Sequence, residues 1–196
     1  SSSNTPIAAP SANISGRPSP TKAADVLFDM DRIIPLIIDG GESNIGIEST
    51  VIDLSTDQAI ILRPGFYTYE FLKTIIDDIK LDDSLVDDSK IPKSPGQKYK
   101  HYAPKAKMRV FIGNDSVNYI KNLSEIHSKE GKKVGILAFE EDKDKFKDYI
   151  CLSLGSKKDL KTMSHVLFSH LREMDRLGVD IILAQGVREI NLGKSI

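Results

Sequence analysis

Three short segments in the first third of the sequence contain residue types that bind anionic ligands. In residues 11–19, serine hydroxyls and exposed amides come directly before an expected helix start. Because the N-terminus of a helix attracts negative charge, this segment suits a phosphate or a carboxylate. A plain loop that only caps the helix explains the same residues, and their spacing does not decide between the two.

The second segment, residues 40–50, is rich in glycine, serine and threonine. Glycines let a backbone approach a ligand closely, and the hydroxyls supply hydrogen-bond donors beside a strand. The segment is not a P-loop, because no Gly-Lys-Ser/Thr sequence follows. A polar turn between two strands is an equally good interpretation.

The third segment is Leu62-Arg63-Pro64-Gly65, at the end of an expected strand. An arginine in this position, beside a glycine turn, is well placed to bind phosphate through its guanidinium group. The alternative is an ordinary solvated arginine at the mouth of a hairpin.

The sequence predicts no metal site formed by side chains and identifies no catalytic residue. His127, His165 and His170 fall in expected helices without the spacing of metal ligands. The single cysteine, Cys151, lies in an apolar run and is interpreted as a core residue.

The bulk composition limits the partners and the compartment that we expect for this chain. The formal net charge of the 196 residues is −1, so no overall basic field attracts nucleic acid, and any RNA contact must be local. No apolar run approaches the roughly 20 residues that cross a bilayer, so we expect no membrane partner. One cysteine permits no intrachain disulfide and fits a reducing compartment, so we expect a cytoplasmic protein.

Local patterns predict short elements around the three segments. Ser19 and Pro20 predict a helix start, with Ser19 as N-cap and an apolar side that begins at Ala23. Thr68 is expected to cap a second helix, whose apolar stripe extends to Ile79. Strands are expected at residues 36–38, 49–54 and 59–62, with a glycine turn at 39–41 and a hairpin turn at 55–58.

Residues 81–107 change in character from acidic to rich in lysine and proline, which favours an extended linker. From residue 108 onward, strands alternate with amphipathic helices. The expected strands are 108–112, 134–139, 149–154 and 180–184, and the expected helices begin at Asn114 or Asp115 and at Leu160, ending near Ser128 and before Gly178. This alternation predicts a parallel, doubly wound sheet.

The motifs, taken in order, resemble those of the threonylcarbamoyl-AMP synthases in their long form. The matching motifs are Pro6-Ile7-Ala8-Ala9-Pro10-Ser11-Ala12-Asn13-Ile14-Ser15-Gly16, Gly46-Ile47-Glu48-Ser49-Thr50-Val51-Ile52-Asp53, Leu62-Arg63-Pro64-Gly65, Ser94-Pro95-Gly96 and His101-Tyr102-Ala103-Pro104. The linker motif is the one that indicates the long form.

The resemblance implies an α/β protein in three parts. Residues 1–80 would be the C-terminal part of a YrdC-like twisted open-sheet catalytic domain, 81–107 a linker, and 108–196 a small Rossmann-like parallel-sheet domain. The family's basic Lys-x-Arg element has no counterpart here. We therefore expect that the front of the catalytic domain is absent, that apolar edges are exposed in its place, and that the chain alone is an incomplete enzyme.

The resemblance also implies an activity, that of an L-threonylcarbamoyladenylate synthase, a nucleotidyltransferase. L-Threonine and bicarbonate form a carbamate that attacks the α-phosphate of ATP, which enters with Mg²⁺, and pyrophosphate leaves. Separate transfer proteins then modify a tRNA adenosine. Residue by residue, the resemblance assigns Ala9 and Ser49 to threonine, and it assigns the ATP contacts to Ser11, Ser19, Arg63 and Tyr102. Tyr102 lies in the linker, which would have to fold back over the site as a lid.

Two other functions remain open. One is a non-catalytic module that binds double-stranded RNA or has a regulatory role, although the net charge and the lack of a basic stripe outside the linker count against it. The other is a nucleotide sensor in the C-terminal domain, which lacks Gly-x-Gly-x-x-Gly after its first strand and rests on fold analogy. Threonine-dependent pyrophosphate release distinguishes the enzyme from the RNA-binding module, which salt-dependent RNA retention without that release would favour.

Overall fold

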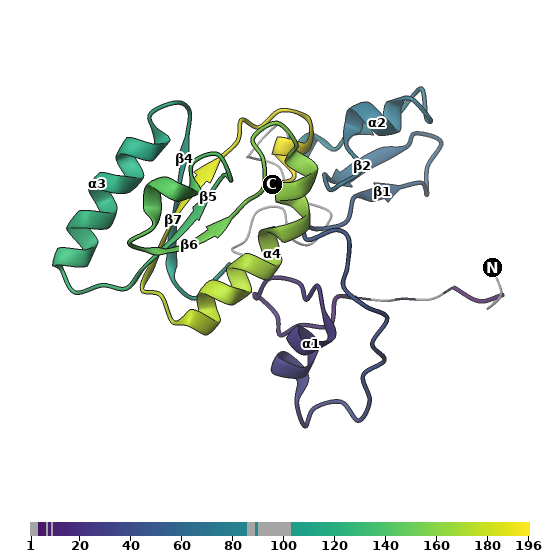
Figure 1. The fold of residues 1–196 in the computed structure, drawn as a ribbon. Helices are drawn as coiled ribbons and strands as arrows, with labels where there is room; N and C mark the ends of the chain where they lie inside the picture. The colour runs from purple at the N-terminus through teal and green to yellow at the C-terminus, as the bar shows by residue number, and fades with distance from the viewer. Residues whose placement is uncertain (1–3, 7, 9, 86–88, 90–102) are drawn as a thin grey trace.

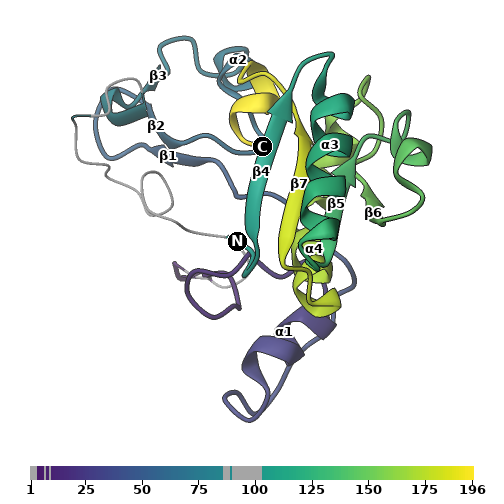
Figure 2. The same cartoon turned by 90° about the vertical axis from the view of Figure 1, so that its left-hand side faces the viewer.

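The computed structural model describes residues 4–6, 8, 10–85, 89 and 103–196. It contains two sheets, one small and mixed and one of four parallel strands (Figure 1). In Figures 1 and 2 the small sheet lies beside the parallel sheet, and the short helix α1 lies close to one end of the long helix α4. Within the described ranges, no helix has both the length and the apolar character to cross a bilayer.

The small sheet carries the third polar segment. Strand β1 (Val51–Asp53) pairs antiparallel with β2 (Ile60–Arg63), which pairs in parallel with β3 (Lys80–Leu81). The predicted hairpin is therefore confirmed. Helix α2 (Tyr69–Lys73) packs on this sheet and is capped as predicted, since Thr68 Oγ1 accepts a hydrogen bond from the backbone of Phe71 at 3.3 Å.

Helix α2 is shorter than its apolar stripe predicted. The next residues, Thr74, Ile75 and Ile76, are β-branched and fit a helix less well. Ile79 still reaches the core of the small sheet, together with Ile61 and Leu72.

Helix α1 (Ala23–Met30) begins later than predicted, with Lys22 rather than Ser19 at the N-cap position. The hydroxyl of Ser19 is hydrogen-bonded to Glu48 instead, so it does not cap the helix. The expected apolar side is also not the buried one. Asp25 and Asp29 are the buried residues of α1, whereas Leu27 and Phe28 are more than half exposed.

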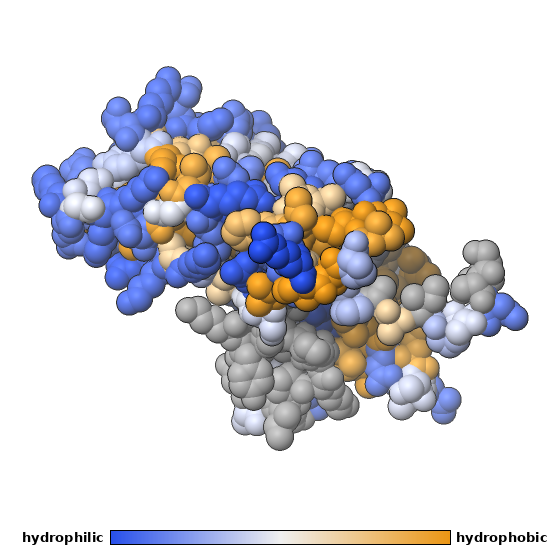
Figure 3. Space-filling view, turned by 90° about the horizontal axis from the view of Figure 1, so that it is seen from below, coloured by the Kyte–Doolittle hydropathy of each residue, from blue (hydrophilic) through white to orange (hydrophobic). Residues whose placement is uncertain are grey.

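The predicted strand at residues 36–38 is wrong, because this segment is irregular, with Leu36 and Ile38 exposed and Ile37 half-buried. A strand needs a hydrogen-bonding neighbour, and no described segment pairs with it. The backbone at the expected glycine turn, 39–41, is irregular as well, although Gly41 has a positive φ of 93° and its amide donates to Asp39 Oδ1 at 2.9 Å. Figure 3 shows that apolar side chains gather on the underside of the molecule as it is drawn in Figure 1. The exposed apolar residues in and directly after α1 are Leu27, Phe28, Ile33, Ile34, Leu36 and Ile38.

The larger sheet confirms the predicted parallel α/β architecture. Its strands lie in the order β4-β7-β5-β6, and all neighbouring pairs are parallel. The strand bounds are Lys107–Ile112 (β4), Val134–Ala138 (β5), Ile150–Ser153 (β6) and Ile181–Gly186 (β7). Helices α3 (Ser116–Lys129) and α4 (Leu160–Leu177) cover opposite faces, which gives three layers (Figure 2).

The two central strands show why this segment folds in this way. Strands β5 and β7 are apolar almost throughout, as expected for strands buried on both faces. Successive residues alternate between two cores. Ile136 packs in the core beneath α3, and Leu137 packs in the core beneath α4. Gly178 closes α4 in a left-handed conformation with φ of 62°, as predicted.

A buried polar network joins the carboxyl ends of the central strands. Burial alone would raise the pKa of Asp142, but hydrogen bonds from Lys145, Lys157 and Gln185 outweigh it and lower the pKa to about 2. Cys151 is half-buried and packs against the core beneath α3, close to the core position interpreted from the sequence, and burial raises the pKa of its thiol to about 11. Both groups are structural parts of this domain.

Short 3-10 helices complete the described elements, at Asp83–Leu85 (η1), Lys143–Phe146 (η2) and Asn191–Lys194 (η3). The small sheet and η1 extend into the first residues of the expected linker. The division of the chain at 80/81 and 107/108 remains a prediction.

Candidate functional site

The third segment meets the second at the end of strand β2. Arg63 Nε donates a hydrogen bond to the Ser49 carbonyl at 3.0 Å, and its Nη2 donates to Ser49 Oγ at 3.0 Å. The same Nη2 lies 3.3 Å from Glu48 Oε2, in an ion pair whose side chains are only 13% and 18% exposed. A residue assigned to ATP and a residue assigned to threonine are therefore in direct contact.

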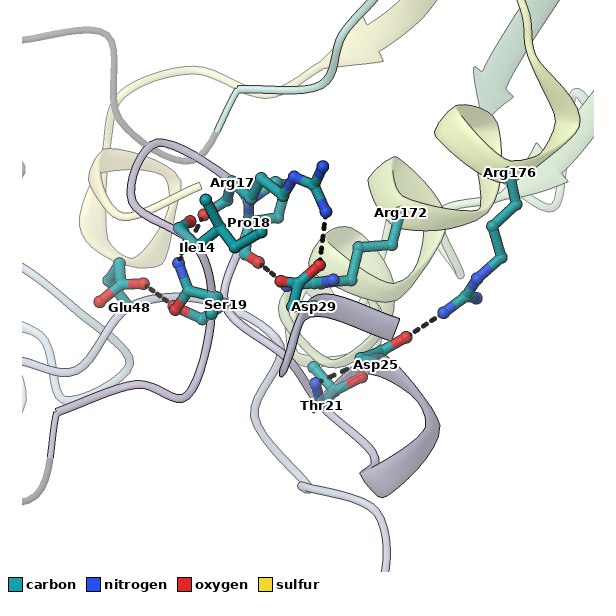
Figure 4. A network of polar contacts seen from close by, with 11 residues as sticks. Ile14, Arg17, Pro18, Ser19, Thr21, Asp25, Asp29, Glu48, Arg172 and Arg176 are labelled. Carbon is teal, nitrogen blue, oxygen red and sulfur yellow. Dashed lines mark hydrogen bonds and ion pairs between the residues drawn. The ribbon is translucent and has the colours of Figure 1, made fainter. Parts of the chain in front are cut away.

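The first segment reaches the same point through Glu48. Ser19 Oγ donates a hydrogen bond of 2.6 Å to Glu48 Oε1 (Figure 4). The two oxygens of one carboxylate therefore bind Ser19 and Arg63. We call Ser19, Glu48, Ser49 and Arg63 the Glu48 cluster. Glu48 itself was not identified from the sequence, although it is the one carboxylate between Gly46 and Val51.

Gly65 allows the backbones of two segments to approach closely at this cluster. A Cβ atom on Gly65 would lie 2.3 Å from the amide nitrogen of Thr50 and 2.5 Å from the carbonyl carbon of Ser49. Both atoms belong to the backbone and cannot rotate away, so the position requires glycine. On the other side, Ser195 Oγ donates to the Gly65 carbonyl at 2.8 Å, which brings the end of the described chain to the site.

The loop before Ser19 is held by its own hydrogen bonds. Asn13 Nδ2 donates to the carbonyls of Ile14 and Arg17 at 3.0 and 3.1 Å. Ser11 is exposed, and among the described residues no polar contact joins it to the Glu48 cluster. The assignments of Ala9 and Tyr102 fall on residues outside the described ranges.

The described end of the linker nevertheless lies against this loop. The amide of Ala103 donates to the Gly16 carbonyl at 3.2 Å, and the amide of Lys105 donates to Asp175 of α4 at 2.8 Å. Ala103, the residue directly after Tyr102, is thus bonded to Gly16, which lies three positions before Ser19 in the sequence.

Two buried carboxylates connect α1 with α4, a feature that the sequence did not reveal (Figure 4). Asp29 accepts hydrogen bonds from Arg172 at 2.8 Å and from Arg17 at 2.7 Å, and Asp25 pairs with Arg176. Burial alone would raise the pKa of Asp29, but the hydrogen bonds from Arg172 and Arg17 outweigh it and lower the pKa. Asp29 is therefore held as a charged group between the two helices.

The Glu48 cluster has the chemistry of a site for an anionic ligand. A guanidinium group with fixed orientation and two serine hydroxyls lie together, and these are the groups that bind phosphates and carboxylates. Over the part of the chain that the structure describes, no three His, Cys, Asp or Glu side chains are grouped to hold a metal ion.

Comparison with known proteins agrees with the motifs. A family model described as the C-terminal domain of threonylcarbamoyl-AMP synthase matches residues 67–196, and a model described as telomere recombination matches residues 1–65. The chain belongs to the threonylcarbamoyl-AMP synthase family. Similar proteins with that name occur in Bacillus subtilis (40% identity over 194 residues), Pyrococcus abyssi (43% over 200) and Schizosaccharomyces pombe (39% over 211).

The same family includes solved structures. The chain superimposes on the crystal structure of P. abyssi Sua5 complexed with L-threonine with a TM-score of 0.83 at 43% identity, over 98% of this chain and 56% of that one. A variant of that protein, with an adjacent histidine and tyrosine changed to alanine, gives a TM-score of 0.82 at 41% identity, over 98% and 55% of the two chains. The three sequence alignments include 99% of this chain but only 56%, 56% and 51% of the relatives, so the chain spans about half of their length.

Proposed function

We propose that this chain is part of an L-threonylcarbamoyladenylate synthase. The protein would make threonylcarbamoyl-AMP and pyrophosphate from L-threonine, bicarbonate and ATP, and other proteins would transfer the product to tRNA in the cytoplasm. The observation that carries this proposal is the Glu48 cluster, in which all three polar segments meet. The names of the relatives, and the threonine bound by the archaeal protein, support it.

The cluster suggests separate roles for its members. Arg63 would stabilise the charge that develops on the phosphates as pyrophosphate leaves, which a positioned guanidinium group does well in a site shielded from water. Glu48 fixes the direction of that group. Ser19, whose one hydroxyl proton goes to Glu48 in this structure, would donate it to ATP when ATP binds, and Ser49 would donate to the carboxylate of threonine. Ser11 remains a proposed ATP ligand on the exposed side of the loop.

Tyr102 and Ala9 complete the proposed site. The hydrogen bond between Ala103 and Gly16 supports the idea that the linker covers the ATP site. The sequence contains one His-Tyr pair, His101-Tyr102, and a His-Tyr pair was replaced in the archaeal structure described above. We propose that Tyr102 contacts ATP from this lid and that Ala9 borders the threonine.

Mg²⁺ would enter the reaction as part of the substrate. Substrate phosphates commonly supply most of the inner ligands of Mg²⁺, with one or two carboxylates from the protein. The lack of a three-residue metal cluster among the described residues is compatible with such binding.

The test is pyrophosphate release with ATP and bicarbonate, measured with and without L-threonine on the protein at the length of its relatives. Release that depends on threonine is the expected result. Release without threonine, or no release at all, would show that the proposed function is wrong. Retention of double-stranded RNA that weakens with salt, in the absence of turnover, would indicate the binding module instead.

A further inference from the structure

Helix α4 of the C-terminal domain contacts both polar segments that meet at the Glu48 cluster. On the first segment, Arg172 donates a hydrogen bond from Nη2 to the Pro18 carbonyl and to Asp29. Arg172 is only 5% exposed, and Pro18 is also buried. Since Pro18 directly precedes Ser19, Arg172 fixes the backbone that presents the Ser19 hydroxyl.

A continuous series of polar contacts extends from α4 to Arg63. Arg172 donates to the Pro18 carbonyl and Ser19 donates to Glu48 (Figure 4). Glu48 in turn pairs with Arg63. Each link joins groups that are buried or partly buried, so solvent screens them less than it would screen a surface pair.

The second segment is attached to α4 through its backbone. Gly46 donates to the Ser164 carbonyl at 2.7 Å and accepts from the amide of Phe168 at 3.1 Å. In a regular α-helix these two groups pair with each other. Ile47, the next residue, is buried in the core beneath α4. Glu48 therefore directly follows two residues, Gly46 and Ile47, that are fixed against α4.

We propose that Arg172 is a positioning residue for the ATP site, and that α4 is part of the structure that gives this site its geometry. Arg172 touches none of the reacting atoms. It keeps Ser19 in reach of Glu48, while the contact at Gly46 keeps Glu48 in reach of Arg63. The inference rests on the proposed function, and it gives the C-terminal domain a role in binding ATP.

Arg176 provides a matched control one helical turn away. It pairs with Asp25, as Arg172 pairs with Asp29, so both arginines join α4 to a buried carboxylate of α1. Its described hydrogen bonds go to Asp25 and Glu173, and none of them reaches Pro18. A general loss of attachment between the helices should affect both variants, whereas a loss of positioning should affect only the variant of Arg172.

The experiment compares Arg172→Met with Arg176→Met in the protein at the length of its relatives. For Arg172→Met, kcat/KM for ATP should fall about tenfold, which corresponds to one hydrogen bond with a charged group. Arg176→Met should stay close to wild type. Equal kinetics for the two variants would overturn the inference.

Arg172→Met removes one of the cations that pair with the buried Asp29, and the protein could unfold for that reason alone. A second variant covers this case. Arg172→Leu combined with Asp29→Leu removes both charges, and such replacements commonly preserve a fold. This double variant should show the same loss towards ATP. Wild-type ATP kinetics in a folded double variant would refute the positioning role.

Hydrogen exchange of the backbone amides separates this inference from the proposed function. Exchange in residues 17–22 should become about tenfold faster in Arg172→Met than in Arg176→Met, because the segment opens more often. If the wild type shows no threonine-dependent turnover but exchange changes as stated, the proposed function is wrong and the link from α4 to the segment stands. If turnover is normal and exchange is equal in both variants, the inference alone fails.

Discussion

Gly46→Ala tests whether the second polar segment is attached to α4 as closely as the structure shows. A Cβ atom on Gly46 would lie 2.1 Å from the carbonyl oxygen of His165, 2.8 Å from its carbonyl carbon and 3.1 Å from the Ser164 carbonyl oxygen. All three are backbone atoms of α4, so no side-chain rotation relieves the contact. The segment must move away from the helix.

The cost of that movement follows from the contacts that it breaks. The hydrogen bonds from Gly46 to Ser164 and from Phe168 to Gly46 contribute about 1 kcal/mol each. Overpacking against a rigid neighbour adds about 1–3 kcal/mol. Reduced freedom of the unfolded chain offsets about 0.4–1 kcal/mol of this. We therefore expect the free energy of unfolding to fall by about 2–4 kcal/mol, a large part of the stability of a typical domain.

The measurement is urea unfolding of the 196-residue chain, followed by circular dichroism, with Gly40→Ala as control. A Cβ atom on Gly40 would meet nothing within 4 Å. For Gly46→Ala we expect the midpoint to fall by about 1–2 M urea at a slope of about 2 kcal/mol per molar. If the two variants unfold at the same midpoint, the close contact of Gly46 with α4 does not exist, and α4 does not position Glu48 through Gly46.

Asp142→Asn should flatten the dependence of stability on pH, because the folded pKa of about 2 lies below the value of about 3.9 for an unfolded aspartate. The charged Asp142 stabilises the fold by about 2 kcal/mol; this stabilisation is fully present above the unfolded pKa and is lost as pH falls through the folded pKa. Equal urea midpoints of variant and wild type at all pH values would contradict this prediction. Arg63→Lys keeps the charge but loses the fork that binds Ser49, so we expect the affinity for ATP to fall about tenfold by calorimetry, and an unchanged affinity would remove Arg63 from the site. Cys151 should react with a disulfide reagent at pH 7 much more slowly in the folded chain than in urea, and equal rates would contradict its burial and raised pKa. A fragment of residues 103–196 should fold by itself with helical circular dichroism, but with lower stability than the whole chain because Ile47 no longer fills the core beneath α4.

The sequence by itself determined the local elements and the residues worth testing. Helix α4 was predicted from Leu160 to Leu177 with Gly178 as its end, because apolar periodicity and a left-handed glycine are properties of neighbouring residues. The cap at Thr68 and the hairpin between β1 and β2 were predicted for the same reason. Ser19, Ser49 and Arg63 were named from motifs, and three-dimensional contacts then brought them together.

Only the tertiary structure decided which faces of these elements are buried and what joins them. The apolar side of α1 was expected to pack inward, but Asp25 and Asp29 are buried instead, because α4 presents Arg172 and Arg176 to them. Asp29 and Arg172 are 143 residues apart. A charge is buried when an opposite charge and hydrogen bonds compensate its loss of hydration, and that compensation comes from a distant part of the chain. For the same reason Glu48 became visible as the link between Ser19 and Arg63 only after the chain had folded.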